Sequence, residues 1–238
     1  MNKCYINLGC FYLLNYVHLE LKYRSDYSIY SKTDKLSSIT EFIQNKGGDC
    51  EDYSLFFKAE YNYAMNKCKG NEIHLEAWKY PDIDYSSLND KAEMIWLNYP
   101  KTWYLDGVVK VDISKNIFPN IICGSLFDAT VNTTMGHCML AFTSNKIETI
   151  SDFKYLEDAY IIEPQLGLYL GNLNNENSGV YLLDEYVLYT DSITSWVDSV
   201  ITDNDYFLFN RENLTWQSYG AFYTVLNLKK NQIGNILK

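Results

Sequence analysis

One long amphipathic segment constrains this sequence more than any other feature. From Cys50 to Lys67 the apolar and aromatic residues recur at steps of three and four. They are Tyr53, Phe56, Phe57, Tyr61, Ala64 and Met65. This period places the side chains along one face of an α-helix, which must be buried against another element. Gly47 and Gly48 interrupt the preceding pattern, so the helix is expected to begin near Cys50.

Shorter patterns on both sides of this helix predict the rest of the fold. Helices are expected in residues 1–22, 38–46 and 88–97, and strands in residues 73–78, 108–113, 138–142, 159–162, 180–189, 206–209 and 221–228. Helices thus come mainly first and strands later, which predicts an α+β fold with a central helix packed against an antiparallel β-sheet.

The stretch from Gly171 to Gly179 is rich in Asn, Ser and Gly and is the best candidate for a domain break. We therefore expect a core over residues 1–170, with an insertion near 79–135. Residues 171–238 are expected to form a C-terminal extension packed on that core.

Composition excludes some partners. The chain has 20 basic and 30 acidic residues, for a formal charge of −10, and no basic stripe, so nucleic acid is not an expected partner. The apolar run from Cys4 to Val17 contains Asn7 and Asn15 and is too short to cross a bilayer, which takes about 20 residues. No signal peptide is recognised, so we predict a cytoplasmic protein that does not bind membranes.

The six cysteines have no compact framework spacing and are expected to be reduced.

The segment Gly47-Gly48-Asp49-Cys50-Glu51-Asp52 is the sharpest local motif. A cysteine at a helix N-terminus lies beside unpaired backbone N–H groups, which stabilise a thiolate and lower its pKa. The flanking carboxylates act in the opposite direction. Cys50 is therefore a candidate nucleophile, although cysteine is also a common core residue.

Two further motifs place a polar side chain at one end of a predicted strand. His137 follows Gly136 and opens the apolar run Cys138 to Phe142, while Glu163 ends a second run and precedes Pro164. If the two strands are neighbours, Glu163 can accept a hydrogen bond from His137 and orient the imidazole. Asp158 is the rival carboxylate at the other end of the second run.

In this order, GGDCEDYS, GHCMLAF and YIIEPQ resemble the motifs of the transglutaminase-like superfamily, including its bacterial and archaeal cysteine-peptidase branch. The segment LKYRSD, at residues 21–26, is similar to the one that precedes the nucleophile in that branch. The sequence departs from the family pattern in having Glu163 where Asp is usual, and Cys138 where Ala is usual. The connection between His137 and Glu163 is also longer than is usual.

The resemblance implies a papain-like core and a cysteine peptidase or amidase that acts on a protein or peptide through a thioester. Cys50 would be the nucleophile, His137 its base and Glu163 the third member of a triad. Gln44 would add an oxyanion donor. No cofactor is required, but Asp49 and Glu51 correspond to positions near which some members bind calcium, whereas zinc-ligand spacings are absent from the sequence. Transfer of the acyl group to an amine, as in a transglutaminase, and an inactive binding module are the alternatives.

Overall fold

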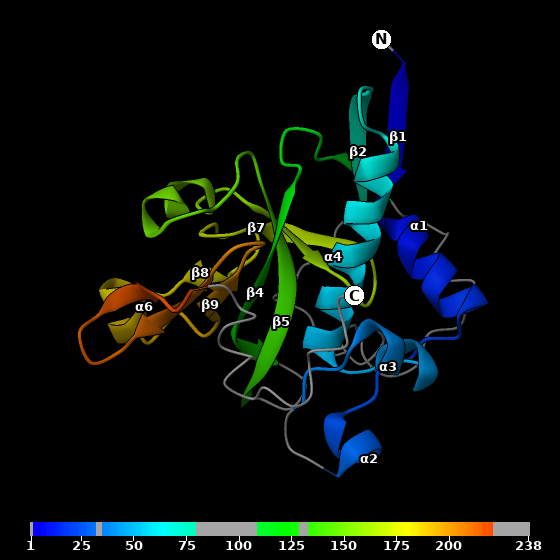
Figure 1. Ribbon diagram of the computed structural model, residues 1–238. Coiled ribbons are helices and arrows are strands. Elements are labelled where there is room, and N and C mark those ends of the chain that lie inside the picture. The colour runs from blue at the N-terminus through cyan, green and yellow to red at the C-terminus, as the bar shows by residue number, and fades with distance from the viewer. Residues whose placement is uncertain (1, 32–34, 80–108, 129–132, 221–238) are drawn as a thin grey trace.

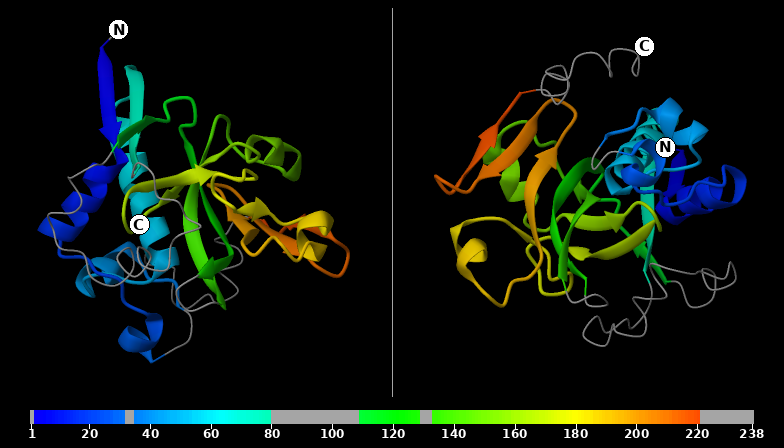
Figure 2. Two further views of the ribbon diagram at one scale, coloured as in Figure 1. Left: turned by 180° about the vertical axis from the view of Figure 1, so that it is seen from behind. Right: turned by 90° about the horizontal axis from the view of Figure 1, so that it is seen from below.

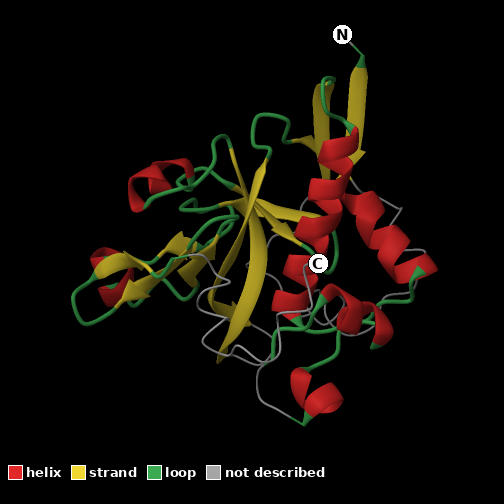
Figure 3. Ribbon diagram, viewed as in Figure 1, coloured by secondary structure: helices red, strands yellow, loops and turns green. Residues whose placement is uncertain are grey.

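The computed structural model describes residues 2–31, 35–79, 109–128 and 133–220 of the 238-residue chain. Over these residues the chain forms a mixed α+β fold, in which a large and mostly antiparallel sheet packs against one long helix (Figures 1 and 3). The general α+β plan expected from the sequence is confirmed.

The first part of the chain is mainly helical. It consists of β1 (Lys3–Asn7), α1 (Leu8–Leu13), a π-helical turn (Leu14–His18), α2 (Asp26–Tyr30), α3 (Ile39–Gln44), α4 (Cys50–Lys67) and β2 (Glu72–Lys79). Strands dominate the middle part, with β3 (Val109–Asp112), β4 (Phe118–Asp128), β5 (Thr133–Thr143), a 3-10 turn (Ile150–Tyr155), β6 (Tyr160–Glu163) and β7 (Leu168–Asn172). The last described part contains β8 (Tyr181–Leu182), α6 (Glu185–Tyr189), β9 (Trp196–Ile201), β10 (Tyr206–Asn210) and β11 (Thr215–Ser218).

Among the described residues, 11 strands form one sheet in the order β1-β2-β7-β6-β5-β4-β9-β10-β11, with β3 added to β2 and β8 to β9. The pairs β1–β2, β2–β7 and β8–β9 are parallel, and the other strand pairs are antiparallel. The centre is the long β4–β5 hairpin, paired from Phe118 and Thr143 to Asp128 and Thr133. It places α4 and the strands that carry the candidate site next to each other.

The second half of β5, from Cys138 to Thr143, is buried on both faces, which explains why its apolar run does not alternate with polar residues. Leu140 and Phe142 pack with Tyr61 of α4 in one apolar cluster, and the rings of Tyr61 and Phe142 meet edge to face at 5.1 Å. Met139 and Ala141 belong to a second cluster, which includes side chains of β9, β10 and the 3-10 turn. Burial of a large apolar side chain contributes about 1.5–3 kcal/mol, so these contacts fix α4 firmly against the sheet.

The start of α4 is fixed by the segments before it. Ser38 forms a capping box with Glu41 at the start of α3, and Phe42 of α3 contacts Tyr53 of α4. Gly47 has a φ of +128°, and a Cβ atom there would lie 1.8 Å from the carbonyl oxygen of Lys22. Only glycine fits that position, so the Gly-Gly turn is a requirement of this close approach.

The helix predicted over residues 1–22 is wrong for residues 3–7, which form β1 parallel to β2. Tertiary pairing overrides the local helical period here, because the strand buries Ile6 and is joined by a disulfide between Cys4 and Cys68.

The strand predicted over residues 180–189 is found only at Tyr181–Leu182, and Glu185–Tyr189 forms helix α6 instead. Asp184 caps this helix by accepting a hydrogen bond from the Val187 N–H at 2.7 Å. The predicted helix at 88–97 and strand at 221–228 lie outside the described residues.

The sheet is continuous across the boundary predicted at residue 170, which falls inside β7. Strands β8 to β11 join it through β9, which pairs with β4. Within the stretch 79–135 predicted as an insertion, the described residues form β3, the central strand β4 and the start of β5. Figure 2 shows β9 to β11 on the side of the β4–β5 hairpin away from β1 and β2.

Four of the six cysteines form disulfides, Cys4–Cys68 and Cys123–Cys138, whereas Cys10 and Cys50 are free thiols. This differs from the expectation of reduced cysteines, because the fold brings together Cys4 of β1 and Cys68 at the end of α4, 64 positions apart, and strand pairing brings together Cys123 and Cys138, 15 positions apart. Disulfides persist mainly in oxidising compartments, which is weakly at odds with a cytoplasmic location. None of the helices in the described ranges has the length and apolar character needed to span a membrane.

Candidate active site

Cys50 is the first residue of α4, and the preceding Asp49 has extended backbone geometry. The backbone carbonyl of Cys50 accepts a hydrogen bond from the Ser54 hydroxyl at 2.8 Å, one turn further along. Residues 22–24 hold the turn before the helix in place, because the N–H groups of Lys22 and Arg24 donate to the carbonyls of Lys46 and Gly48, each at 2.9 Å. The half-buried Cys50 thiol is therefore carried on a fixed backbone.

His137 lies in β5 and Glu163 ends β6, the neighbouring strand. The Nε2 atom of His137 is 2.7 Å from Oε2 of Glu163, and the two side chains are 10% and 2% exposed. The other carboxylate oxygen of Glu163 accepts a hydrogen bond from the Gln165 N–H at 3.0 Å. A buried carboxylate with both oxygens bonded has one orientation, and it fixes the orientation of the imidazole in turn.

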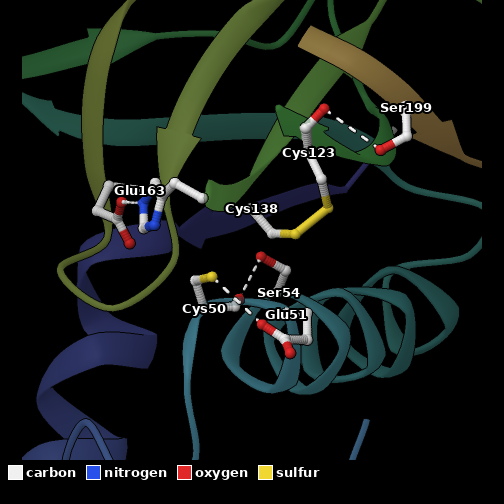
Figure 4. Close-up of a disulfide and its surroundings, with 8 residues drawn as sticks. Cys50, Glu51, Ser54, Cys123, Cys138, Glu163 and Ser199 are labelled. Carbon is white, nitrogen blue, oxygen red and sulfur yellow. Dashed lines mark hydrogen bonds and ion pairs between the residues drawn. A yellow bond between two sulfur atoms is a disulfide. The ribbon is translucent and has the colours of Figure 1, made fainter. Parts of the chain in front are cut away.

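The thiol of Cys50 contacts β5 at the residue that follows His137. The backbone N–H of Cys138 lies near enough to the Cys50 sulfur to lower its pKa, and the side-chain sulfurs of Cys50 and Cys138 lie within 4.8 Å of each other. Pairing of β5 with β6 begins only at Leu140, beyond this contact. Figure 4 shows Cys50, the Cys123–Cys138 disulfide and Glu163 around this part of the sheet. The three sequence motifs therefore converge on one region.

The electrostatic surroundings of the thiol are acidic. Burial, and next the charge of Glu51, raise the pKa of Cys50 well above its usual value, and the Cys138 N–H opposes this only in part. The thiol donates a hydrogen bond to Oε2 of Glu51 at 3.3 Å. The lowering expected from the helix N-terminus is thus outweighed by burial and by the flanking carboxylate. In this arrangement Cys50 is a protonated thiol that needs a base to become a nucleophile.

Further carboxylates surround the turn before α4. Burial and the neighbouring Glu51 raise the pKa of Asp49, and burial raises the pKa of Asp52 to about 6. Oxygens of Asp26, Asp49 and Asp52 lie within 4.8 Å of one another. Asp52 accepts a hydrogen bond from the Ser37 N–H through Oδ1, while its buried Oδ2 has no hydrogen-bond partner among the described residues.

Hard oxygen donors of this kind suit calcium more than zinc. A second group of potential ligands, Cys50, Glu51 and Cys138, is unsuited to a metal because the Cys138 sulfur is part of a disulfide.

Tyr23 is also close to this acidic region. Burial, and then the nearby Cys50, Asp49 and Glu51, raise the pKa of its phenol to about 12. The hydroxyl is therefore protonated at neutral pH and is available as a hydrogen-bond donor. Its position follows from the backbone bonds that join residues 22 and 24 to the Gly-Gly turn.

The remaining predicted site residues are placed as follows. Gln44 is exposed at the end of α3, so its role as an oxyanion donor stays a prediction. Asp158 is exposed before the start of β6, at the end of the strand away from Glu163. The structure joins Glu163 to His137, and Asp158 contributes its backbone carbonyl to Asn172.

Two features of the site were not expected from the sequence, namely the hydrogen bond from the Cys50 thiol to Glu51 and the Cys123–Cys138 disulfide. Cys123 and Cys138 stand directly opposite each other in the β4–β5 hairpin, with Cα atoms 4.1 Å apart. A hairpin prediction centred between them would have revealed the pair, but the sequence pattern of residues 118–128 did not identify β4.

Comparisons with protein-family models, with curated proteins and with solved structures give no match.

Proposed function

We propose that this chain is a cysteine-dependent acyl-transfer enzyme with a transglutaminase-like, papain-like core, acting as a thiol hydrolase on an amide bond of a protein or peptide. The observation that carries the proposal is the buried contact of 2.7 Å between His137 and Glu163, next to the Cys138 backbone that touches the Cys50 thiol. An oriented imidazole and a thiol at a helix N-terminus are the parts that such chemistry requires.

The roles follow from the hydrogen bonds. With Nε2 of His137 bonded to Glu163, Nδ1 is the ring nitrogen that takes the proton of Cys50 and later returns it to the leaving amine. The resulting imidazolium is stabilised by the carboxylate. Cys50 then attacks the substrate carbonyl and forms a thioester, which water hydrolyses. The backbone N–H of Cys50 and the side chain of Gln44 are the proposed oxyanion donors.

The carboxylates of the turn before α4 form the proposed calcium site. Asp49 and Asp52, with Asp26, would hold the ion, and the buried Oδ2 of Asp52 would gain a partner. A bound divalent cation would offset the negative charge that raises the pKa of Cys50. Glu51 would remain beside the thiol, where it already accepts its hydrogen bond.

Alkylation kinetics test the proposed pairing without a known substrate. Iodoacetamide at low dose should label the half-buried Cys50 faster than the exposed free thiol of Cys10, because the proposed mechanism gives a base to Cys50 alone. In His137→Ala, labelling of Cys50 should slow by about tenfold or more, while Cys10 serves as the internal control. Equal labelling of the two thiols in the wild-type chain would refute the proposal.

Turnover of a peptide library gives the second test. Cys50→Ser and His137→Ala should abolish cleavage, and Glu163→Gln should lower kcat by about 10²-fold while keeping the fold, since the imidazole can still act as base. Stable incorporation of an added amine into a glutamine-containing substrate would instead identify a transglutaminase. A fold that survives all three substitutions with no activity in any form, including the wild type, would favour a binding module.

A further inference from the structure

The free thiol of Cys50 lies beside a disulfide bond. Its sulfur is within 4.8 Å of the Cys138 sulfur, which is bonded to Cys123 across the β4–β5 hairpin. In Figure 4 the Cys50 sulfur points toward the disulfide and lies on the side of Cys138, with Cys123 beyond it. This is the arrangement in which a thiol can attack one sulfur of a disulfide while the other sulfur leaves.

We propose that Cys50 exchanges with the Cys123–Cys138 disulfide, so that the chain interconverts between two disulfide isomers. The Cys50 sulfur forms a bond with the Cys138 sulfur, and the bond between Cys138 and Cys123 breaks. The electron pair leaves with Cys123, which takes up the proton that Cys50 loses. One disulfide and one thiol are present before and after the step, so no external oxidant or reductant is needed.

The fold permits this exchange without large movement. Cys138 is a partner in both isomers and lies in the centre of the sheet, where the backbone pairing of β4 with β5 extends over 11 residues on each strand. The hairpin therefore keeps its register when the Cys123–Cys138 bond is broken. Cys50 is fixed at the start of α4, with its sulfur within 4.8 Å of the Cys138 sulfur. The two sulfurs must approach from within 4.8 Å to bonding distance, about 2.05 Å, for the second isomer to form.

The exchange would regulate the site, and in this respect the inference rests on the proposed function. A Cys50 that is bonded to Cys138 has no thiol to attack a carbonyl, so the second isomer is inactive. A reductant that cleaves either disulfide would restore the nucleophile. Cys138, the residue next to the proposed base His137, can therefore block the Cys50 thiol in a disulfide that a reductant reverses.

Disulfide mapping of the folded full chain tests the exchange directly. The protein is equilibrated, quenched in acid, unfolded, labelled with N-ethylmaleimide and digested with pepsin, and the labelled cysteines are quantified by mass spectrometry. We expect label on both Cys50 and Cys123, and at least about tenfold less on Cys123 in Cys50→Ser, where the exchange has no attacking thiol. The matched control Cys10→Ser should label Cys123 as the wild type does.

A second variant isolates the new bond. In Cys123→Ser, glutathione disulfide should oxidise Cys50 and Cys138 to a Cys50–Cys138 disulfide, recovered as one cross-linked peptide, with circular dichroism confirming the fold. Label restricted to Cys50 and Cys10 in the wild type, or loss of Cys123 label in Cys10→Ser, would overturn the inference. These measurements need no substrate, so a chain that exchanges but lacks hydrolase activity would refute the proposed function alone.

Discussion

Glu60→Gln is expected to stabilise the folded chain above neutral pH. Glu60 lies in α4, and its Oε2 accepts a hydrogen bond from Nδ2 of Asn15 at 2.7 Å. Burial raises the pKa of this carboxyl from 4.5 to about 7, and the Asn15 bond opposes the increase only in part. The buried Oδ1 of Asn15 has no hydrogen-bond partner among the described residues. A glutamine would keep the acceptor, remove the charge and offer an N–H₂ group to that oxygen.

The sign and size follow from linkage. A carboxyl whose folded pKa exceeds its unfolded value contributes stability below the unfolded pKa, and that stability is lost as pH rises through the folded value. The difference between 4.5 and about 7, at about 1.4 kcal/mol per pKa unit, corresponds to roughly 3 kcal/mol when Glu60 is fully ionised. Relaxation and water access reduce this, so we expect a gain of about 1–3 kcal/mol at pH 8.

Urea unfolding of wild type and Glu60→Gln from pH 4.5 to pH 8 measures the effect. The difference in unfolding free energy should be small at the acid end and should grow through pH 7. Glu157→Gln, at an exposed position, is the matched control and should change little at any pH. A constant difference across this range, or a loss of stability at pH 8, would refute the assignment of a buried, strained charge to Glu60.

Three further predictions concern the buried Lys58 of α4, the Cys4–Cys68 disulfide and the acidic turn before α4. Lys58 is 9% exposed in an ion pair of 2.9 Å with Asp203, which is 61% exposed, and burial lowers the pKa of the lysine. Lys58 also donates to the Pro119 carbonyl at 2.9 Å and Asp203 is largely exposed, so Asp203→Asn should lower the unfolding free energy by about 1–2 kcal/mol and Lys58→Met by less than about 1 kcal/mol; the reverse order in urea unfolding would contradict this account. Cys4→Ser opens a link between residues 64 positions apart and should cost about 4 kcal/mol by chain entropy, a difference that should disappear when both proteins are unfolded in dithiothreitol. Millimolar calcium should raise the Tm of the wild type but not of Asp52→Asn, and an equal response of the two proteins would remove Asp52 from the proposed calcium site.

The parts of the fold that local patterns specify were predictable. Helix α4 has the expected bounds, because its apolar period and the Gly-Gly turn are both encoded within about 20 residues of sequence. Strands β2, β6 and β10 also match their predicted positions to within a residue or two. In α4 the predicted aromatic residues Tyr53, Phe56, Phe57 and Tyr61 are buried, but so are Asp52, Ser54 and Lys58, which the apolar pattern does not indicate.

Features that depend on distant partners were not predictable in this way. Strand β1 exists because it pairs with β2, and its own residues also fit a helical period. The Cys123–Cys138 disulfide depends on strand register, the Cys4–Cys68 disulfide depends on where β1 lies against the end of α4, and the raised pKa of Cys50 depends on how deeply the helix start is buried. For the candidate site, the sequence predicted which motifs carry the chemistry. It did not predict that Glu51 would accept a hydrogen bond from the Cys50 thiol.

The parallel pairing of β1 with β2 has a consequence for how the chain assembles. Strand β1 begins at Lys3 and β2 at Glu72, so β1 has no partner until the whole of α4 has been synthesised. Residues 8–71 must then close as a loop, and Ile6 stays exposed to solvent until they do. Formation of the Cys4–Cys68 bond would hold this loop closed from that moment on. Strand β1 is therefore placed in the sheet only after the helix that carries Cys50 is complete.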